Sequence, residues 1–165
     1  MRVAIVTVSD SVFDEHRRDT SGDEIAAWCS VRGYAVTSRD HVADETSSIA
    51  PLLARACDGG DVDLVLTTGG TGLSPRDVTP EATRAVIDRE AQGIAEYLRA
   101  VSFGHFPRAA LSRGIAGVRR SAMIVNLPGS TNGVRESLAA LEKVVDHAVD
   151  VLSGKVTRHD GEKGA

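Results

Sequence analysis

A run of apolar residues that stops at two glycines constrains the fold of this chain more than any other feature. Residues 62–68 read VDLVLTT and are followed at once by Gly69 and Gly70. A short apolar run rich in β-branched residues and bounded by turn residues is typical of a strand that is buried on both faces. The segment therefore predicts a central strand of a sheet, with a loop directly beyond its carboxyl end.

Strand-like and helix-like segments alternate along the rest of the chain. We expect strands at residues 3–8, 34–42, 62–68, 115–118 and 122–127, and helices at 21–32, 49–58, from 79 onward, at 92–101 and at 134–152. The last two strands flank a polar turn, which favours a hairpin and makes part of the sheet antiparallel. The alternation implies an α/β fold, a three-layer sandwich with a mainly parallel central sheet.

Local signals predict how three of these helices begin. Ser21 and Glu24 have the spacing of a capping box, so Ser21 is expected to cap the first helix. Pro51 is tolerable only if it lies in the first turn of the second helix. Thr79 is expected to cap the third helix, with Pro80 as its first residue.

Length and composition exclude several classes of protein. The 165 residues suit one domain, which we place at 1–155, followed by a polar tail at 156–165. The net charge of −4 gives no sign of a general nucleic-acid binder. No apolar run approaches the ~20 residues of a membrane span, and the first residues are too short for a signal peptide. Cys29 and Cys57 lie in apolar helical patterns, as expected for buried free thiols. We therefore expect a cytoplasmic protein that binds neither nucleic acid nor membranes.

Three loops are predicted to meet at one edge of the sheet. They are residues 9–19, 69–78 and 128–132, and each follows a predicted strand. In open α/β sheets, ligands bind beyond the carboxyl ends of the strands. The sequence thus predicts one composite site made from these loops.

The glycine-rich loop is the strongest candidate for binding an anion. Gly69, Gly70, Thr71 and Gly72 follow the strand directly, and glycines allow close approach of the backbone and positive φ angles. Exposed amides in such a loop can cradle an anion. Neither the P-loop nor the dinucleotide-binding pattern is present. A tight turn with no ligand is an equally good interpretation of these four residues alone.

Charged and hydroxyl side chains near the loops extend the candidate site. Arg76 could hold a phosphate through two hydrogen bonds. Asp77 could ligate Mg²⁺, or it could cap a helix or hold Arg76. Ser130 and the helix after it form a second candidate anion site, although an ordinary Pro-Gly turn with a serine cap is the favoured interpretation of these residues taken alone. Ser112 and Arg113 could reach a phosphate or support a loop.

Several motifs together resemble one family, the MogA/MoaB domains of molybdenum-cofactor biosynthesis. This family includes the molybdopterin adenylyltransferase domains of gephyrin and of plant fusion proteins. The segments that carry the resemblance are TTGGTGLSPRDVTPEAT (67–83), LSR (111–113), NLPGS (126–130), TVSDS (7–11), DTSG (19–22) and ADE (43–45).

The resemblance implies a function and a set of site residues. It implies a trimer or hexamer that binds molybdopterin and ATP and, with Mg²⁺, adenylylates molybdopterin with release of pyrophosphate. A downstream molybdenum-insertion protein is a possible partner. Asp77 and Asp44 match the family's catalytic and metal-binding carboxylates. The positions that match its ligand-binding loops are Ser9, Asp10, Ser11, Gly69, Gly70, Thr71, Gly72, Ser112, Pro128, Gly129 and Ser130.

Two departures keep other functions open. Ala43 stands where the family often has proline, and the chain has the shorter form shared with the MoaB branch. One alternative is therefore a protein that binds molybdopterin without catalysing transfer. Another is a protein that shares only the fold, like the related domain of competence-damage proteins that act on nucleotide pyrophosphates.

Overall fold

The computed structural model describes residues 1–13, 17–104 and 106–155. The predicted polar tail at 156–165 lies outside these residues. None of the helices in this described part has the length and hydropathy needed to cross a bilayer.

A six-stranded sheet forms the centre of the molecule, with the strand order β2-β1-β3-β6-β5-β4. The strands are β1 (Arg2–Val8), β2 (Ala35–Val42), β3 (Leu64–Thr68), β4 (Arg89–Glu90), β5 (Ala116–Arg119) and β6 (Ala122–Leu127). Strands β1, β2, β3 and β6 are parallel, whereas β5 runs antiparallel to both of its neighbours, β6 and β4. The mainly parallel sheet and the β5–β6 hairpin confirm the prediction. The two-residue strand β4 was not expected.

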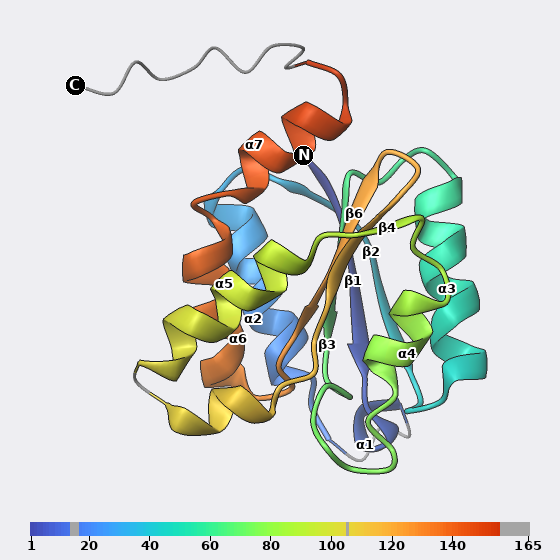
Figure 1. The fold of residues 1–165 in the computed structure, drawn as a ribbon. Coiled ribbons are helices and arrows are strands. Elements are labelled where there is room, and N and C mark those ends of the chain that lie inside the picture. Colours follow the sequence, from blue (N-terminus) through green and yellow to red (C-terminus); the bar gives the residue numbers. More distant parts are fainter. Residues whose placement is uncertain (14–16, 105, 156–165) are drawn as a thin grey trace.

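Helices cover both faces of the sheet (Figure 1). They are α1 (Asp10–Phe13), α2 (Thr20–Val31), α3 (Thr46–Asp58), α4 (Thr79–Arg84), α5 (Gln92–Phe103), the 3-10 helix η1 (Pro107–Leu111), α6 (Thr131–Leu141) and α7 (Val145–Leu152). Helices α2, α5, α6 and α7 lie on one side, and α3 and α4 lie on the other. Alternate side chains of β1 enter the two cores, with Ile5 in one and Ala4 and Val6 in the other. The three-layer sandwich is therefore confirmed.

The first predicted helix cap is wrong. Asp19, and not Ser21, caps α2 by accepting a hydrogen bond from the Gly22 amide. Glu24 pairs with Arg135 on α6 instead of closing a capping box. Both candidate caps are residue types that cap helices well, so the choice between them depends on contacts made by distant parts of the chain.

Three other local predictions also need correction. Pro51 lies inside α3, beyond its first turn, on the exposed side of the helix. Val78 is the cap residue of α4, so Thr79 is the first helical residue and Pro80 the second. The long final helix is two helices, because α6 ends at Leu141 and α7 begins at Val145. Both carry an apolar face, so the apolar spacing alone did not reveal the break.

The remaining differences concern the ends of β1 and β2. The predicted loop at 9–19 begins with the short helix α1. Strand β2 is an edge strand of the sheet, and most of its residues are exposed.

Candidate functional site

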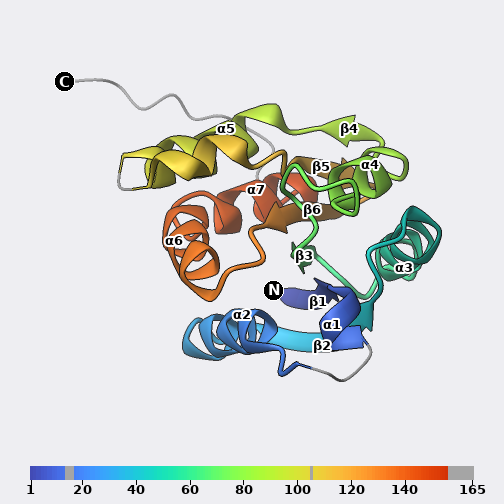
Figure 2. The ribbon, with the colours of Figure 1, turned by 90° about the horizontal axis from the view of Figure 1, so that it is seen from below.

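The three predicted loops lie together at the carboxyl ends of β1, β3 and β6 (Figure 2). The hydroxyl of Thr68, at the end of β3, donates to the Pro128 carbonyl at 2.7 Å. A Cβ built on Gly129 would lie 3.2 Å from the Cα of Gly69, so the two loops are in direct backbone contact. The Ser9 amide donates to the Val42 carbonyl at 3.0 Å, which joins the loop after β1 to the end of β2.

The backbone of the glycine-rich loop requires glycine at its first two positions. Gly69 has φ +97° and Gly70 has φ +61°. A Cβ on Gly69 would lie 2.1 Å from the Val8 carbonyl oxygen. The Thr79 hydroxyl donates to the Gly69 carbonyl at 2.9 Å and fixes the loop against the start of α4. The backbone conformation therefore explains why residues 69 and 70 are glycines. The part of the loop that a ligand could contact is formed by Thr71 and Gly72.

Carboxylates gather on one side of this loop. The Asp10 amide donates to Asp44 Oδ2 and the Asp44 amide donates to Asp10 Oδ1, both at 2.9 Å. Burial raises the pKa of the Asp44 carboxyl, the Asp10 amide opposes this rise, and the negative charges of Asp10 and Asp77 add to it. Asp44 also borders the glycine-rich loop, because a Cβ built on Gly70 would lie 3.1 Å from its Oδ1.

Asp77 closes a turn in the glycine-rich loop. Its Oδ2 accepts a hydrogen bond from the Ser74 amide at 2.7 Å. The same oxygen lies 2.9 Å from the position of a Cβ on Gly72, so Asp77 lies directly against the loop. The other proposed structural roles of Asp77 are not observed, because Val78 is the cap residue of α4 and Arg76 is held by Asp10.

Asp44 and Asp77 can hold Mg²⁺ only together with ligands from a substrate. Among the described residues, no group of three or more His, Cys, Asp or Glu side chains is placed to hold a metal ion. Mg²⁺ is commonly bound through one or two carboxylates, with phosphate oxygens and water completing the octahedron. Two carboxylates that border the glycine-rich loop fit that donor set.

Two arginines that could have held phosphate are engaged with the protein. Arg76 Nη2 lies 2.8 Å from both Asp10 carboxylate oxygens. Arg113 donates from Nε to the Gly72 carbonyl at 2.8 Å and from Nη2 to the Asp77 carbonyl at 2.5 Å. Arg113 therefore supports the glycine-rich loop, as one of its two predicted roles required. Arg76 connects α1 to the same loop through its ion pair with Asp10.

A cleft of about 740 Å³ opens on the other side of the glycine-rich loop. It runs between α5 and η1 on one wall and the start of α6 on the other. Six of the predicted site residues line it: Thr71, Gly72, Ser112, Pro128, Gly129 and Ser130. The rest of the predicted set does not line it: Ser9, Asp10, Ser11, Asp44, Gly69, Gly70 and Asp77. The site is therefore two-sided, with the glycine-rich loop between the carboxylates and the cleft.

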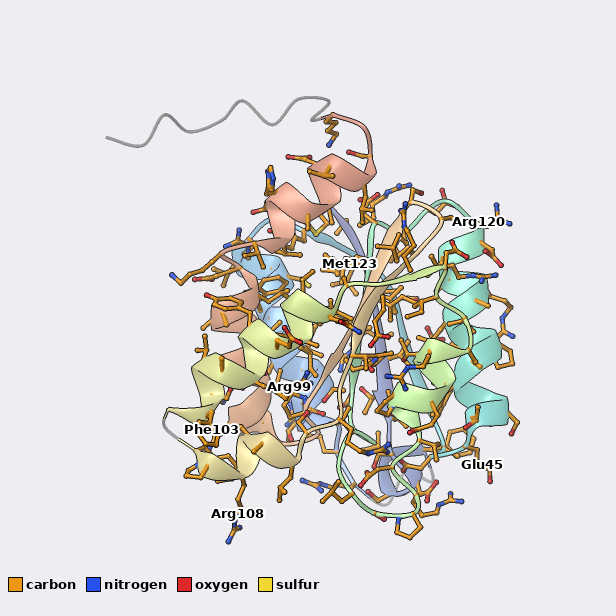
Figure 3. The ribbon with its side chains drawn as sticks, viewed as in Figure 1. Glu45, Arg99, Phe103, Arg108, Arg120 and Met123 are labelled. Atoms are coloured by element: carbon orange, nitrogen blue, oxygen red, sulfur yellow. The ribbon has the colours of Figure 1, made fainter. Side chains whose placement is uncertain are left out.

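The sequence did not predict that α5 forms one wall of the cleft. Leu98 on α5, together with Phe106 at the start of η1, gives this wall an apolar surface. Arg99 (labelled in Figure 3) donates from Nη1 to the Gly114 carbonyl at 2.6 Å. In the sequence, Leu98 belongs to an apolar helical face and is indistinguishable from an ordinary core residue.

Buried hydrogen bonds make the floor of the cleft rigid. Asn126 Nδ2 donates to the hydroxyls of Thr67 and Thr83 at 3.0 and 2.9 Å. Its Oδ1 accepts from the Ile115 amide at 3.2 Å. At the start of α6, Ser130 caps the helix by accepting from the Gly133 amide at 3.2 Å.

Fold and site together define an α/β ligand-binding domain that can hold a phosphorylated ligand beyond the ends of its strands. The sequence model of the family described as "Probable molybdopterin binding domain" matches residues 4–147. The chain belongs to this family, the MogA/MoaB domains that its motifs resemble.

Similar proteins come from bacteria and animals. The molybdopterin adenylyltransferase of Helicobacter pylori strain J99 is 43% identical over 113 residues, covering 68% of this chain and 64% of that protein. The molybdenum cofactor synthesis protein cinnamon of Drosophila melanogaster is 36% identical over 155 residues, covering 93% of this chain and 26% of that protein. The chain thus spans less than two thirds of the first relative and about a quarter of the second.

The crystal structure of the molybdopterin biosynthesis enzyme MoaB from Thermus thermophilus has the same fold. It superimposes with a TM-score of 0.88 at 46% sequence identity, covering 95% of this chain and 99% of that chain.

Proposed function

We propose that this protein is a molybdopterin adenylyltransferase. It would bind molybdopterin in the cleft between α5 and α6, and Mg-ATP on the carboxylate side of the glycine-rich loop. The observation that carries the proposal is the position of this loop, which separates a cleft from the carboxylates of Asp44 and Asp77. The name of the similar Helicobacter pylori protein supports the same reaction.

The reaction joins two anions. A phosphate oxygen of molybdopterin forms a bond to the α-phosphorus of ATP, and the bond from that phosphorus to the bridging oxygen of the β-phosphate breaks. Pyrophosphate leaves with the electron pair. The attacking phosphate is ionised at neutral pH, so the protein does not have to supply a nucleophile or a general base. The protein's contribution is alignment of the two phosphates and reduction of their repulsion.

The residues of the loop would perform this alignment. Thr71 and Gly72 would position the molybdopterin phosphate near the start of α6, where Ser130 and the first-turn amides favour an anion. Asp44 and Asp77 would ligate Mg²⁺, which when bound neutralises charge on the triphosphate. Arg113 would keep the loop in place through the Gly72 and Asp77 carbonyls.

The alternative is a protein that binds molybdopterin without transferring an adenylyl group. The chain has the shorter form that resembles the MoaB branch of the family, and this length favours the alternative. In that case Asp44 and Asp77 would serve only to shape the loop.

Incubation of the wild-type protein with molybdopterin, ATP and Mg²⁺ separates the two functions. Release of pyrophosphate that requires all three components is expected for the enzyme. Binding of molybdopterin without pyrophosphate release would support the binding protein and contradict the proposed reaction.

We further propose a cytoplasmic homotrimer, or a hexamer of two trimers, that passes its product to a molybdenum-insertion protein. Sedimentation of the purified protein would measure the oligomeric state directly. A single species at the mass of one 17.4 kDa chain would contradict the assembly.

A further inference from the structure

The cleft contains a carboxylate that the proposed chemistry does not use. Glu136 lies on α6 and lines the cleft with an exposed side chain. The neighbouring Arg135 is occupied by Glu24, at 2.5 Å. Within the described residues, no Lys, Arg or His nitrogen lies within 4.0 Å of the Glu136 carboxylate. Glu136 therefore carries its negative charge into the cleft without a cation beside it.

Arg99 and Arg108 also line the cleft, but neither forms an ion pair with Glu136, so the carboxylate is unfavourable for an anion bound beside it. A phosphate beside Glu136 would be repelled, so this part of the cleft must receive a different part of the ligand. A carboxylate only accepts hydrogen bonds, and its two oxygens suit a pair of adjacent N–H donors. The chemistry of Glu136 thus selects a flat ring edge that carries two neighbouring donors.

The positions along α6 separate the two ends of such a ligand. Ser130 caps the helix, and Glu136 follows it at a distance of about 9 Å along the axis, at 1.5 Å per residue. A phosphate at the start of α6 and a donor-bearing ring edge at Glu136 therefore occupy separate ends of the cleft.

The facing wall suits a flat heterocycle. Leu98 and Phe106 supply apolar surface from α5 and the start of η1. Arg99 has one N–H committed to the Gly114 carbonyl, which leaves other guanidinium donors for a ring carbonyl or ring nitrogen.

We propose that Glu136 determines specificity by recognising the pyrimidine edge of the pterin in molybdopterin. Its carboxylate accepts hydrogen bonds from the 2-amino group and from N3–H, while the phosphate arm lies at the start of α6. This inference rests on the proposed function, because it assigns one end of the same ligand in the same cleft.

The assignment predicts which ring the cleft rejects. A 2,4-dioxopteridine has the shape of a 2-amino-4-oxopteridine but presents an oxygen in place of the amino group. That oxygen would face the Glu136 carboxylate and repel it, so the wild-type site discriminates against the dioxo ring.

Glu136→Gln tests the proposal, with Glu96→Gln as a matched control. Glu96 is an exposed glutamate on the facing helix α5, and it does not line the cleft. Both variants change the charge by the same amount at exposed helical positions, so both should fold. The dissociation constants to measure are those of molybdopterin, under anaerobic conditions, and of Mg-ATP. We would also measure how strongly the 2-amino-4-oxopteridine and the 2,4-dioxopteridine compete with molybdopterin for binding.

The proposal expects Glu136→Gln to bind molybdopterin about tenfold or more weakly, since a charge-assisted hydrogen bond is lost, with Mg-ATP binding unchanged. Its preference for the 2-amino ring over the dioxo ring should disappear, because the amide can donate to the new oxygen. Glu96→Gln should behave like wild type.

Unchanged molybdopterin affinity or unchanged ring preference in Glu136→Gln would overturn the assignment while leaving the proposed function intact. Failure of the wild-type protein to bind molybdopterin at all would overturn both.

Discussion

Gly69 shows how one residue fixes the position of the site. Its left-handed φ and the 2.1 Å approach of a built Cβ to the Val8 carbonyl mean that no L side chain fits there without moving β1 or the loop. A glycine-rich loop was predictable from the sequence. The neighbour that makes Gly69 necessary was not, because Val8 is far away along the chain.

Gly69→Ala should lower the free energy of unfolding by roughly 2–4 kcal/mol, since the strained φ and the steric overlap add. Urea denaturation of both proteins measures this difference. Gly93→Ala is the matched control. A Cβ on Gly93, in α5, would meet nothing within 4 Å, so no loss of stability is expected. Equal stability of Gly69→Ala and wild type would contradict the account of the loop.

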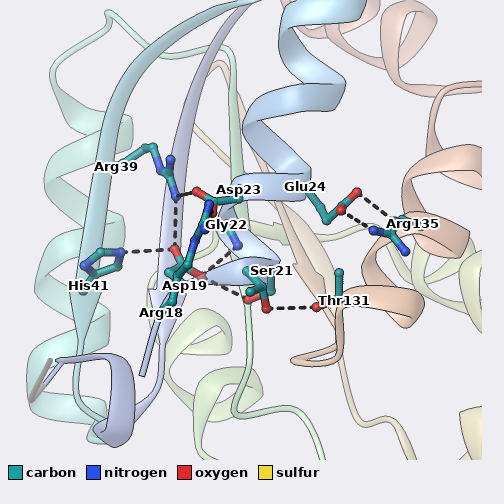
Figure 4. A network of polar contacts seen from close by, with 11 residues as sticks. Arg18, Asp19, Ser21, Gly22, Asp23, Glu24, Arg39, His41, Thr131 and Arg135 are labelled. Atoms are coloured by element: carbon teal, nitrogen blue, oxygen red, sulfur yellow. Dashed lines mark hydrogen bonds and ion pairs between the residues drawn. The ribbon is translucent and has the colours of Figure 1, made fainter. Parts of the chain in front are cut away.

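Asp19 joins three elements through one buried carboxylate. It accepts hydrogen bonds from Thr7 on β1 at 2.8 Å and from Gly22 at the start of α2 at 2.8 Å (Figure 4). On β2 it contacts His41 at 3.1 Å and Arg39 at 3.3 Å. Nearby, the Thr20 and Thr131 hydroxyls lie 3.0 Å apart and connect α2 to the start of α6. Asp19 thus holds the helix that contacts the rim of the cleft.

The Asp19 network predicts a pH-dependent contribution to stability. Burial raises the pKa of the Asp19 carboxyl, but the hydrogen bonds from Gly22, Thr7, His41 and Ser21 outweigh it and hold the pKa below the ordinary 3.8. A group with a lowered folded-state pKa stabilises the fold above its unfolded-state pKa, and this stabilisation is lost as the pH falls through the folded-state value.

Asp19→Asn should therefore be less stable than wild type at pH 7, by roughly 1–3 kcal/mol from the weakened cap and buried hydrogen bonds. The difference should shrink as the pH falls below 3.8. Urea titrations from pH 7 to pH 3 measure it. Asp61→Asn, at a side chain that is 91% exposed, serves as the control and should show little difference at any pH. If the difference in free energy of unfolding between wild type and Asp19→Asn did not change with pH, the charge of Asp19 would not stabilise the fold.

At the scale of elements, the sequence predicts what depends on local pattern and fails where distant contacts decide. Strand β3 was clear because a buried strand is a continuous apolar run. The cap of α2 was wrong because Asp19 is selected by Thr7 and His41, which are remote in sequence. The break between α6 and α7 was missed because both helices continue the same apolar spacing.

At the scale of the whole molecule, the meeting of three loops was predictable from the parallel sheet, and its division into two sides was not. The cleft depends on α5 packing opposite α6, which no single segment encodes. The α5 residues that line it have the same apolar periodicity as a core-facing helix.

The two-sided site predicts two patterns of protection from hydrogen exchange. Molybdopterin should slow exchange in residues 95–103, 107–112 and 128–134, which border the cleft. A non-hydrolysable Mg-ATP analogue should instead slow exchange in residues 10–13 and 73–78, near Asp44. Mass spectrometry of peptides from the liganded and free protein distinguishes the patterns. Protection of the same segments by both ligands would contradict the division.

Pyrophosphate release by Asp77→Asn measures whether the Asp77 carboxylate is required for adenylyl transfer. Asparagine keeps an oxygen that can accept from the Ser74 amide, so the turn is preserved while the charge is lost. With molybdopterin, ATP and Mg²⁺, we expect turnover by wild type and by the control Asp61→Asn. Asp77→Asn should lose about 100-fold or more, as for removal of a major electrostatic contribution to the transition state. Molybdopterin affinity should stay within about threefold, because Asp77 does not line the cleft. Full turnover by Asp77→Asn would contradict the account.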